Sequence, residues 1–166
     1  MGIPFQQAYS GNFLHASRGR ADISYLVLHD AAKTDSTAKE NAALFAHDAL
    51  SVSAHYYVDE TGVWQSVRDE DVAWHCGTKG MYVHPYCRNA NSIGIALCSR
   101  SSNGRYYFSP ETMVNAQTLA RLLMDRYGID RVHVLRHYDV THKTCPVPFV
   151  EREAAWCAFR DGLEEQ

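Results

Sequence analysis

The hydrophobic pattern of the chain predicts strands at several places. Residues 23–28, ISYLVL, form a continuous apolar run of the kind found in strands that are buried on both faces of a sheet. Residues 132–135, VHVL, predict a second, shorter strand. Residues 54–67 contain two strand-like runs around a polar turn, which is the pattern of a β-hairpin.

A further strand, at residues 91–99, alternates strictly and so has two different faces. One face carries large aliphatic side chains: Ile93, Ile95 and Leu97. The other face carries only small side chains: Ser92, Gly94, Ala96 and Cys98. A face of small residues either packs closely against a neighbour or leaves room for one, so we expect another group to lie over it.

Helical periodicity and capping residues predict three helices. Thr37 and Glu40 have the spacing of a capping box and open a helix with a clear apolar face. The longest helix begins at Pro110, because proline suits the first helical position, and it ends at Gly128. A last helix is predicted over residues 148–163.

Strands that alternate with helices, with one hairpin among them, predict an α/β fold. In this fold a mixed central β-sheet is flanked by helices on both faces. The chain has no internal repeat, low-complexity tract or linker rich in Pro, Gly or Ser, and its length suits a domain that buries its own core. We therefore expect residues 1–166 to form a single domain, and we expect that domain to be a monomer.

Charge and hydropathy exclude some classes of partner. The net charge is −3 and the pI is near 6.3, which argues against a surface for nucleic acid. The apolar run at 23–28 is too short to cross a membrane, and the first residues lack the apolar stretch of a secretory signal. We therefore expect a protein made in the cytoplasm without a signal peptide, with a small molecule or a neutral polymer as its partner.

The cysteine and histidine content raises the question of a metal. The five cysteines are an odd number without any C-x-x-C pair, so we interpret them as mostly buried, reduced thiols rather than a disulfide framework. Nine histidines are many for this length. Two of them, His29 and His137, follow the predicted strands at 23–28 and 132–135.

If these two strands are parallel neighbours, His29 and His137 meet at one edge of the sheet, where the ligand sites of open α/β sheets lie. Cys145 can return through the following loop as a third ligand. Two imidazoles and a thiolate leave one tetrahedral position open, which is the geometry of catalytic zinc. The alternative is a pair of strand-end histidines and an unrelated buried cysteine, and spacing alone leaves both interpretations open.

The chain also carries five longer segments in a characteristic order: ISYLVLHDAA, SVSAHYYVDETGVWQSV, DVAWHCG, NANSIGIALC and LRHYDVTHKTCPVPF. Together they resemble the zinc-dependent N-acetylmuramoyl-L-alanine amidases of phage endolysins and bacterial autolysins, whose fold is shared with peptidoglycan recognition proteins. The resemblance runs from about Gly11 to Phe159. It implies that the substrate is bacterial peptidoglycan and that the scissile bond is the amide between the lactyl group of muramic acid and L-alanine.

The resemblance also implies roles for particular residues. His29, His137 and Cys145 are by this resemblance the zinc ligands. Lys143 matches the position whose cation stabilises the oxyanion of the tetrahedral intermediate, a role that its charge suits. His75 resembles a position beside the substrate groove, with a structural histidine as the alternative. We expect the protein to reach the cell wall after lysis or release, as endolysins do, and we see no separate wall-binding domain.

One departure from the family pattern concerns the general base. By the resemblance, the strand NSIGIALC carries a glutamate where Ala96 stands, and that carboxylate takes the proton of the attacking water. Other branches of the family use a tyrosine one position before the histidine of SVSAHYYV, where this chain has Ala54. Neither alanine can accept a proton, and base catalysis is typically worth about 10²–10⁴ in rate. The sequence therefore predicts impaired catalysis.

Three explanations of Ala96 stay open. A glutamate was deliberately replaced to trap a substrate complex, or the protein is a zinc-containing peptidoglycan-recognition module that binds without cutting, or another group acts as the base. The candidates for that group are Asp30, His75 and His142. We favour the first explanation because the segments ISYLVLHD and HKTCP are intact. A zinc hydrolase of an unrelated amide is a further alternative, supported only by the missing base.

Overall fold

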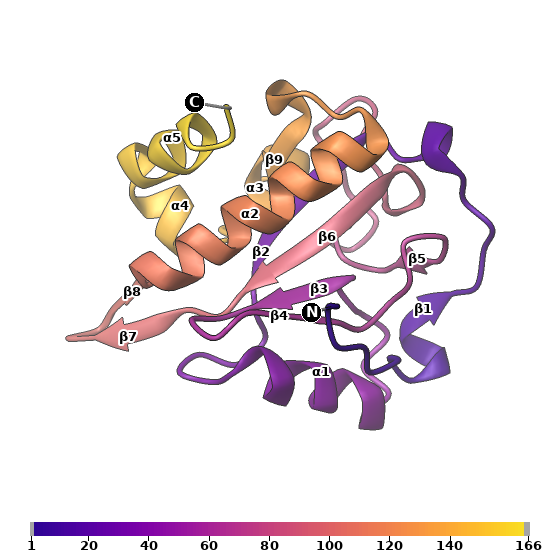
Figure 1. Ribbon diagram of the computed structural model, residues 1–166, viewed down its shortest axis with the longest axis horizontal. Coiled ribbons are helices and arrows are strands. Elements are labelled where there is room, and N and C mark those ends of the chain that lie inside the picture. The colour runs from indigo at the N-terminus through magenta and orange to yellow at the C-terminus, as the bar shows by residue number, and fades with distance from the viewer. Residues whose placement is uncertain (1, 165–166) are drawn as a thin grey trace.

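The computed structural model describes residues 2–164 and has a central sheet of five strands in the order β4-β3-β6-β2-β9 (Figure 1). The strands are β2 (Tyr25–Asp30), β3 (Tyr56–Val58), β4 (Val63–Gln65), β6 (Ser92–Leu97) and β9 (Val134–Arg136). Neighbouring strands are parallel except β3 and β4, which form the predicted hairpin. The predicted mixed sheet is therefore confirmed, and so is the parallel pairing on which the metal-site prediction depends.

Helices cover both faces of this sheet, as predicted. They are α1 (Ala38–His47), α2 (Pro110–Tyr127), α3 (His137–Thr141), α4 (Val147–Glu151) and α5 (Glu153–Asp161). On one face lie α2, α4 and α5 (Figure 1). Their buried side chains pack over the large aliphatic side chains of β2 and β6. On the other face, α1 packs near β3 and β4, and α3 places Val140 against Val27. Within residues 2–164, no helix has both the length and the apolar content that a bilayer crossing requires.

The predicted helix ends are confirmed by their hydrogen bonds. The Glu40 amide donates to the Thr37 hydroxyl and the Thr37 amide donates to the Glu40 carboxylate, which closes the capping box of α1. Ser109 caps α2 ahead of Pro110. Gly128 ends α2 with a φ of 69°, a left-handed conformation that glycine adopts without a Cβ penalty.

Several short elements escaped the sequence analysis. Two small antiparallel pairings join β1 (Phe13–Leu14) to β5 (Val72–Ala73) and β7 (Arg100–Ser102) to β8 (Arg105–Tyr107). Four 3₁₀ turns lie at Ser10–Asn12, Arg20–Asp22, Asn89–Asn91 and Arg131–His133 within the described part of the chain. Segments of two or three residues are too short to show an alternation, so their pairing depends on contacts with the rest of the fold.

The prediction of one helix over 148–163 is wrong, because the structure divides this segment into α4 and α5 at Arg152. The backbone of Arg152 leaves the helical region, with φ −129° and ψ 88°. Arg136 stabilises the break, because its guanidinium donates to the Phe149 carbonyl at 3.0 Å and to the Glu153 carboxylate at 2.8 Å. In a continuous helix, the Phe149 carbonyl would accept from the Glu153 amide instead.

Phe149→Ala should lower the free energy of unfolding by about 3–5 kcal/mol, the usual cost of emptying a large aromatic site in a core. Phe149 is 1% exposed, and its ring packs against Phe108, Trp156 and Phe159. Chemical denaturation measures the change. Val114→Ala, at an exposed position of α2, is the control and should change stability by less than about 0.5 kcal/mol. Equal stability of the two variants would show that Phe149 does not anchor this face of the core.

Candidate metal centre and active site

The three predicted metal ligands lie together at the carboxyl ends of β2 and β9. Leu28 pairs with Arg136 in these parallel strands, so the next residues along, His29 and His137, are neighbours. His29 belongs to β2 itself, whereas His137 is the first residue of α3 rather than the end of a strand. Cys145 returns to the same place through the loop after α3, and its Sγ lies 3.9 Å from His29 Nδ1.

The donor set and its spacing fit a zinc ion. One donor atom from each of His29, His137 and Cys145 lies within 4.8 Å of the others, and all three residues are buried. Two nitrogens and one sulfur on a tetrahedral zinc lie about 3.3–3.6 Å apart, so a small movement would close this set around an ion. The buried Nδ1 of His137 has no hydrogen-bond partner among the described residues, and a metal would satisfy it.

The protonation of these side chains also suits a metal. Burial lowers the pKa of His137 to about 4, and burial followed by the charges of His137 and Lys143 holds the pKa of His29 well below its ordinary value. Both imidazoles are therefore neutral at pH 7, and each has a lone pair to donate. Burial, with the Asp30 carboxylate as a second cause, raises the pKa of Cys145 to about 12. The Cys145 sulfur therefore needs a bound cation to become a thiolate at neutral pH.

Lys143 lies in the exposed loop between α3 and Cys145. His142 ends α3 in a left-handed conformation, with φ 64°, so the chain turns back along the helix. The Cys145 amide donates to the Lys143 carbonyl at 2.8 Å, and the Tyr138 amide donates to the Cys145 carbonyl at 2.9 Å. Burial is the main cause of the lowered pKa of His137, and the positive charge of Lys143 is the next. Lys143 is therefore close enough to interact electrostatically with a candidate ligand.

Ala96 lies beside His29 on the same face of the sheet. The register pairs Ala96 with His29 on one side and with Tyr57 on the other, and Ala96 is 3% exposed. Tyr57 is not a candidate base, because burial raises the pKa of its hydroxyl far above the ordinary value and keeps it protonated. The position that the resemblance assigns to a glutamate is therefore adjacent to a candidate ligand, and its side chain here has no acidic or basic group.

Asp30, one of the alternative bases, points to the opposite face of β2 from His29. There its Oδ2 accepts a hydrogen bond of 2.6 Å from the Val147 amide at the start of α4. Burial raises the pKa of Asp30 to about 6, which would suit a base, and its other oxygen, Oδ1, is buried without a hydrogen-bond partner among the described residues. His142, another alternative, is exposed, and its ring packs against Tyr138.

His75 is in direct contact with His29. Its Nδ1 is 2.9 Å from His29 Nε2, and its Nε2 is 3.0 Å from Ser92 Oγ. Thr78 makes a similar contact with the second candidate ligand, since its Oγ1 is 3.3 Å from His137 Nε2. The sequence analysis assigned no role at the site to Ser92 or Thr78. The one available signal was the small-residue face of β6, which includes Ser92 and predicted that another group lies over it. A role for His75 beside a substrate groove stays a prediction.

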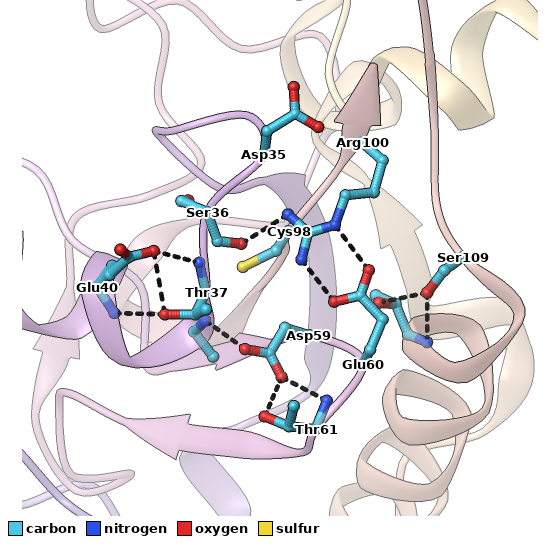
Figure 2. A network of polar contacts seen from close by, with 12 residues as sticks. Asp35, Ser36, Thr37, Glu40, Asp59, Glu60, Thr61, Cys98, Arg100 and Ser109 are labelled. Atoms are coloured by element: carbon cyan, nitrogen blue, oxygen red, sulfur yellow. Dashed lines mark hydrogen bonds and ion pairs between the residues drawn. The ribbon is translucent and has the colours of Figure 1, made fainter. Parts of the chain in front are cut away.

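A polar network holds residues 35–37, in the loop that follows the end of β2 at Asp30 (Figure 2). Arg100 donates to both carboxylate oxygens of Glu60, at 2.7 and 2.5 Å, and to the Ser36 carbonyl at 2.9 Å. These contacts tie the loop to the β3–β4 turn and to β7. The loop that follows β2 is therefore held in place by polar contacts with Arg100.

The fold and the site together define an α/β protein with a buried cluster of two histidines and one cysteine that could hold a metal ion. Three protein ligands are the number found in catalytic rather than structural zinc sites. Comparison with protein families identifies the particular family. The Amidase_2 model, N-acetylmuramoyl-L-alanine amidase, matches residues 19–148. The chain belongs to this family, as the resemblance predicted.

Curated relatives carry the same description. The chain is 31% identical over 152 residues to the N-acetylmuramoyl-L-alanine amidase CwlL of Bacillus licheniformis, with 87% of this chain and 41% of that protein covered. It is 33% identical over 120 residues to a probable N-acetylmuramoyl-L-alanine amidase of the same species, with 70% and 33% covered. The chain thus spans about two fifths or less of the length of these relatives.

Solved structures show the same fold. PlyL has a TM-score of 0.81 at 24% identity, covering 99% of this chain and 98% of that one. The catalytic domain of XlyA has a TM-score of 0.74 at 24% identity, with 99% and 100% covered. AmiD from E. coli, solved with the substrate anhydro-N-acetylmuramic acid-L-Ala-D-gamma-Glu-L-Lys, has a TM-score of 0.56 at 27% identity, with 75% and 52% covered.

Proposed function

We propose that the protein is a zinc-dependent amidase that cleaves the bond between N-acetylmuramic acid and L-alanine in bacterial peptidoglycan, with catalysis impaired at Ala96. The observation that carries the proposal is the convergence of His29, His137 and Cys145 at the ends of two parallel strands, in a chain of the amidase family. The names of the curated relatives and the muramyl peptide bound to AmiD support the choice of substrate.

Each site residue has a role in the proposed reaction. His29, His137 and Cys145 would hold the metal, and a bound zinc ion would supply a Lewis acid for the amide carbonyl and for water. Lys143 stabilises the negative charge that develops on the amide oxygen. Ala96 offers no acceptor for the proton of the attacking water. Because the ligands and Lys143 are present, we propose slow turnover rather than none.

Metal binding gives a direct test of the proposed ligands. We expect one zinc ion per chain, and Cys145→Ser should lower both zinc content and affinity, because a hydroxyl is a much poorer ligand than a thiolate. Cys157→Ser changes an exposed cysteine and is the matched control, which should keep its zinc. Elemental analysis after dialysis measures the content. Full zinc retention in both His29→Ala and Cys145→Ser proteins would contradict the assignment.

The reaction itself is tested with purified cell walls. We expect slow release of soluble stem peptides that begin with L-alanine, and a chelator should stop the release. The position of the new amino terminus distinguishes this amidase from an enzyme that cuts within the stem peptide. Cleavage of unrelated amides with no release from walls would favour a different zinc hydrolase.

A second candidate function is a peptidoglycan-recognition module that retains zinc and does not cut. Two observations favour it: Ala96 stands beside His29, and the nearby Asp30 carboxylate already accepts a hydrogen bond from the Val147 amide. This function predicts that the protein is retained on purified walls at full zinc occupancy while no stem peptide appears in solution.

A further inference from the structure

A series of polar contacts leads from β6 to the candidate ligand His29. Ser92 Oγ lies 2.7 Å from the Arg88 carbonyl oxygen and 3.0 Å from His75 Nε2. The other nitrogen of the same ring, His75 Nδ1, lies 2.9 Å from His29 Nε2. The remaining nitrogen, His29 Nδ1, faces Cys145 Sγ at 3.9 Å.

The position of each proton follows from the first of these contacts. A carbonyl oxygen only accepts, so the single hydroxyl proton of Ser92 is donated to Arg88. The Ser92 oxygen must then accept from His75 Nε2–H, which leaves Nδ1 of that neutral ring as an acceptor. His29 therefore carries its proton on Nε2 and donates it to His75, and its Nδ1 is unprotonated.

We propose that His75, held by Ser92, is a positioning residue that fixes the tautomer and ring orientation of His29 so that Nδ1 faces the metal. This inference rests on the proposed zinc function and adds to it a residue outside the three ligands. Metal-ligating histidines generally donate their other ring N–H to a fixed acceptor, which orients the ring and raises its basicity. Here that acceptor is a neutral imidazole.

The surroundings of His75 keep its ring in one place. A Cβ atom added to Gly94 would lie 2.7 Å from His75 Cγ, so the ring rests directly against the glycine backbone. The amides of His75 and Cys76 both donate to Asn89 Oδ1, at 3.0 and 2.9 Å. The small residues of β6 therefore make room for this histidine, which is the group that the alternation predicted without identifying it.

Two substitutions of His75 separate the hydrogen-bond acceptor from the bulk of the side chain. Asparagine and leucine are similar in size, but only asparagine can place an oxygen acceptor near the original Nδ1 position. We expect His75→Leu to weaken zinc affinity about 10–100-fold, the usual effect of losing such a partner, and His75→Asn to retain most of the affinity. Competition with a chromogenic chelator measures both. Unchanged affinity in His75→Leu, or equal losses in the two variants, would overturn the inference.

Gly94→Ala displaces the His75 ring without removing a polar group, so it should weaken zinc binding as His75→Leu does. His133→Ala removes a half-exposed histidine that contacts Asp130, and it should keep the full affinity. Circular dichroism identifies any variant that does not fold. A folded Gly94→Ala protein with the affinity of the parent would count against the proposed positioning.

Long-range ¹H–¹⁵N spectra of the imidazole nitrogens give a readout that does not depend on zinc. In the metal-free full chain we expect His29 to be protonated at Nε2 and unprotonated at Nδ1, and we expect His75→Leu to lose this preference. A His29 proton on Nδ1 would overturn the inference even if zinc binds. Failure of the parent protein to bind zinc would instead reject the proposed function, and the spectra would still decide the tautomer.

Discussion

Ala96→Glu is expected to raise the rate of stem-peptide release from purified cell walls at least about tenfold, a lower bound set below the roughly 10²–10⁴ that a positioned base typically supplies. Ala96 pairs with His29 across β2 and β6, and its neighbours beneath α1 include Ala31 and Ala54. Tyr57 pairs with Ala96 on the other side, so we expect a glutamate at this position to extend toward His29 rather than toward Tyr57. Its carboxylate can then accept the proton of the attacking water as the amide carbon is attacked.

Ala96→Gln is the matched control, because glutamine has nearly the shape of glutamate without its basic carboxylate. It should cut walls at the rate of the parent protein, and all rates should be compared at equal zinc occupancy. If the alanine, glutamine and glutamate proteins cut equally fast, another group is the base and the interpretation of Ala96 is wrong. If none of them cuts while all bind walls, the recognition-module function replaces the enzymatic one.

Lys143→Ala, made in the Ala96→Glu protein, is expected to lower turnover about 10²–10³-fold, the usual cost of losing one donor to an oxyanion. The Lys143 cation already affects two of the candidate ligands. Burial is the main cause of the lowered pKa of His137 and of His29, and the charge of Lys143 is among the further causes. Its positive charge gives the largest stabilisation when negative charge develops on the amide oxygen in the transition state. Binding to walls should therefore change little, and steady-state kinetics together with a wall-binding assay separate the two effects.

Lys39→Ala is the control for the loss of a lysine charge, because Lys39 lies on α1 with its ammonium 5.8 Å from the centre of the Trp64 ring. Its turnover should match that of the unmodified background. If Lys143→Ala instead weakens wall binding and leaves turnover unchanged, Lys143 is a binding residue rather than a stabiliser of the oxyanion.

Local patterns in the sequence were sufficient for most of the fold. The alternation of β6, the continuous apolar run of β2 and the caps of α1 and α2 each depend on residues within a few positions of one another. The hairpin at 54–67 is local in the same sense. These signals also gave the fold class, because the order of strands and helices restricts how a sheet can be covered.

The candidate ligands were predictable only in part. The predicted strands before His29 and His137 suggested that both histidines lie at one edge of the sheet. That the two strands are parallel neighbours depends on the whole fold and cannot be read from the local sequence. Cys145 lies 116 positions from His29 in the sequence. Its place in the loop after His137 made it a possible third ligand, and the family resemblance was needed to prefer that interpretation. The departure at Ala96 stays a prediction of the family resemblance, which needs only the order of the motifs.

By itself, then, the sequence determined the main strands and helices, the family resemblance and the identity of the candidate ligands. The tertiary structure alone decided that the last helix breaks at Arg152, that the Asp30 carboxylate accepts from the Val147 amide, and that His75 lies between Ser92 and His29. The physical reason is sequence separation. His75 is 46 positions from His29, and a hydrogen bond between such residues exists only after parallel strands and loops have been brought together by packing.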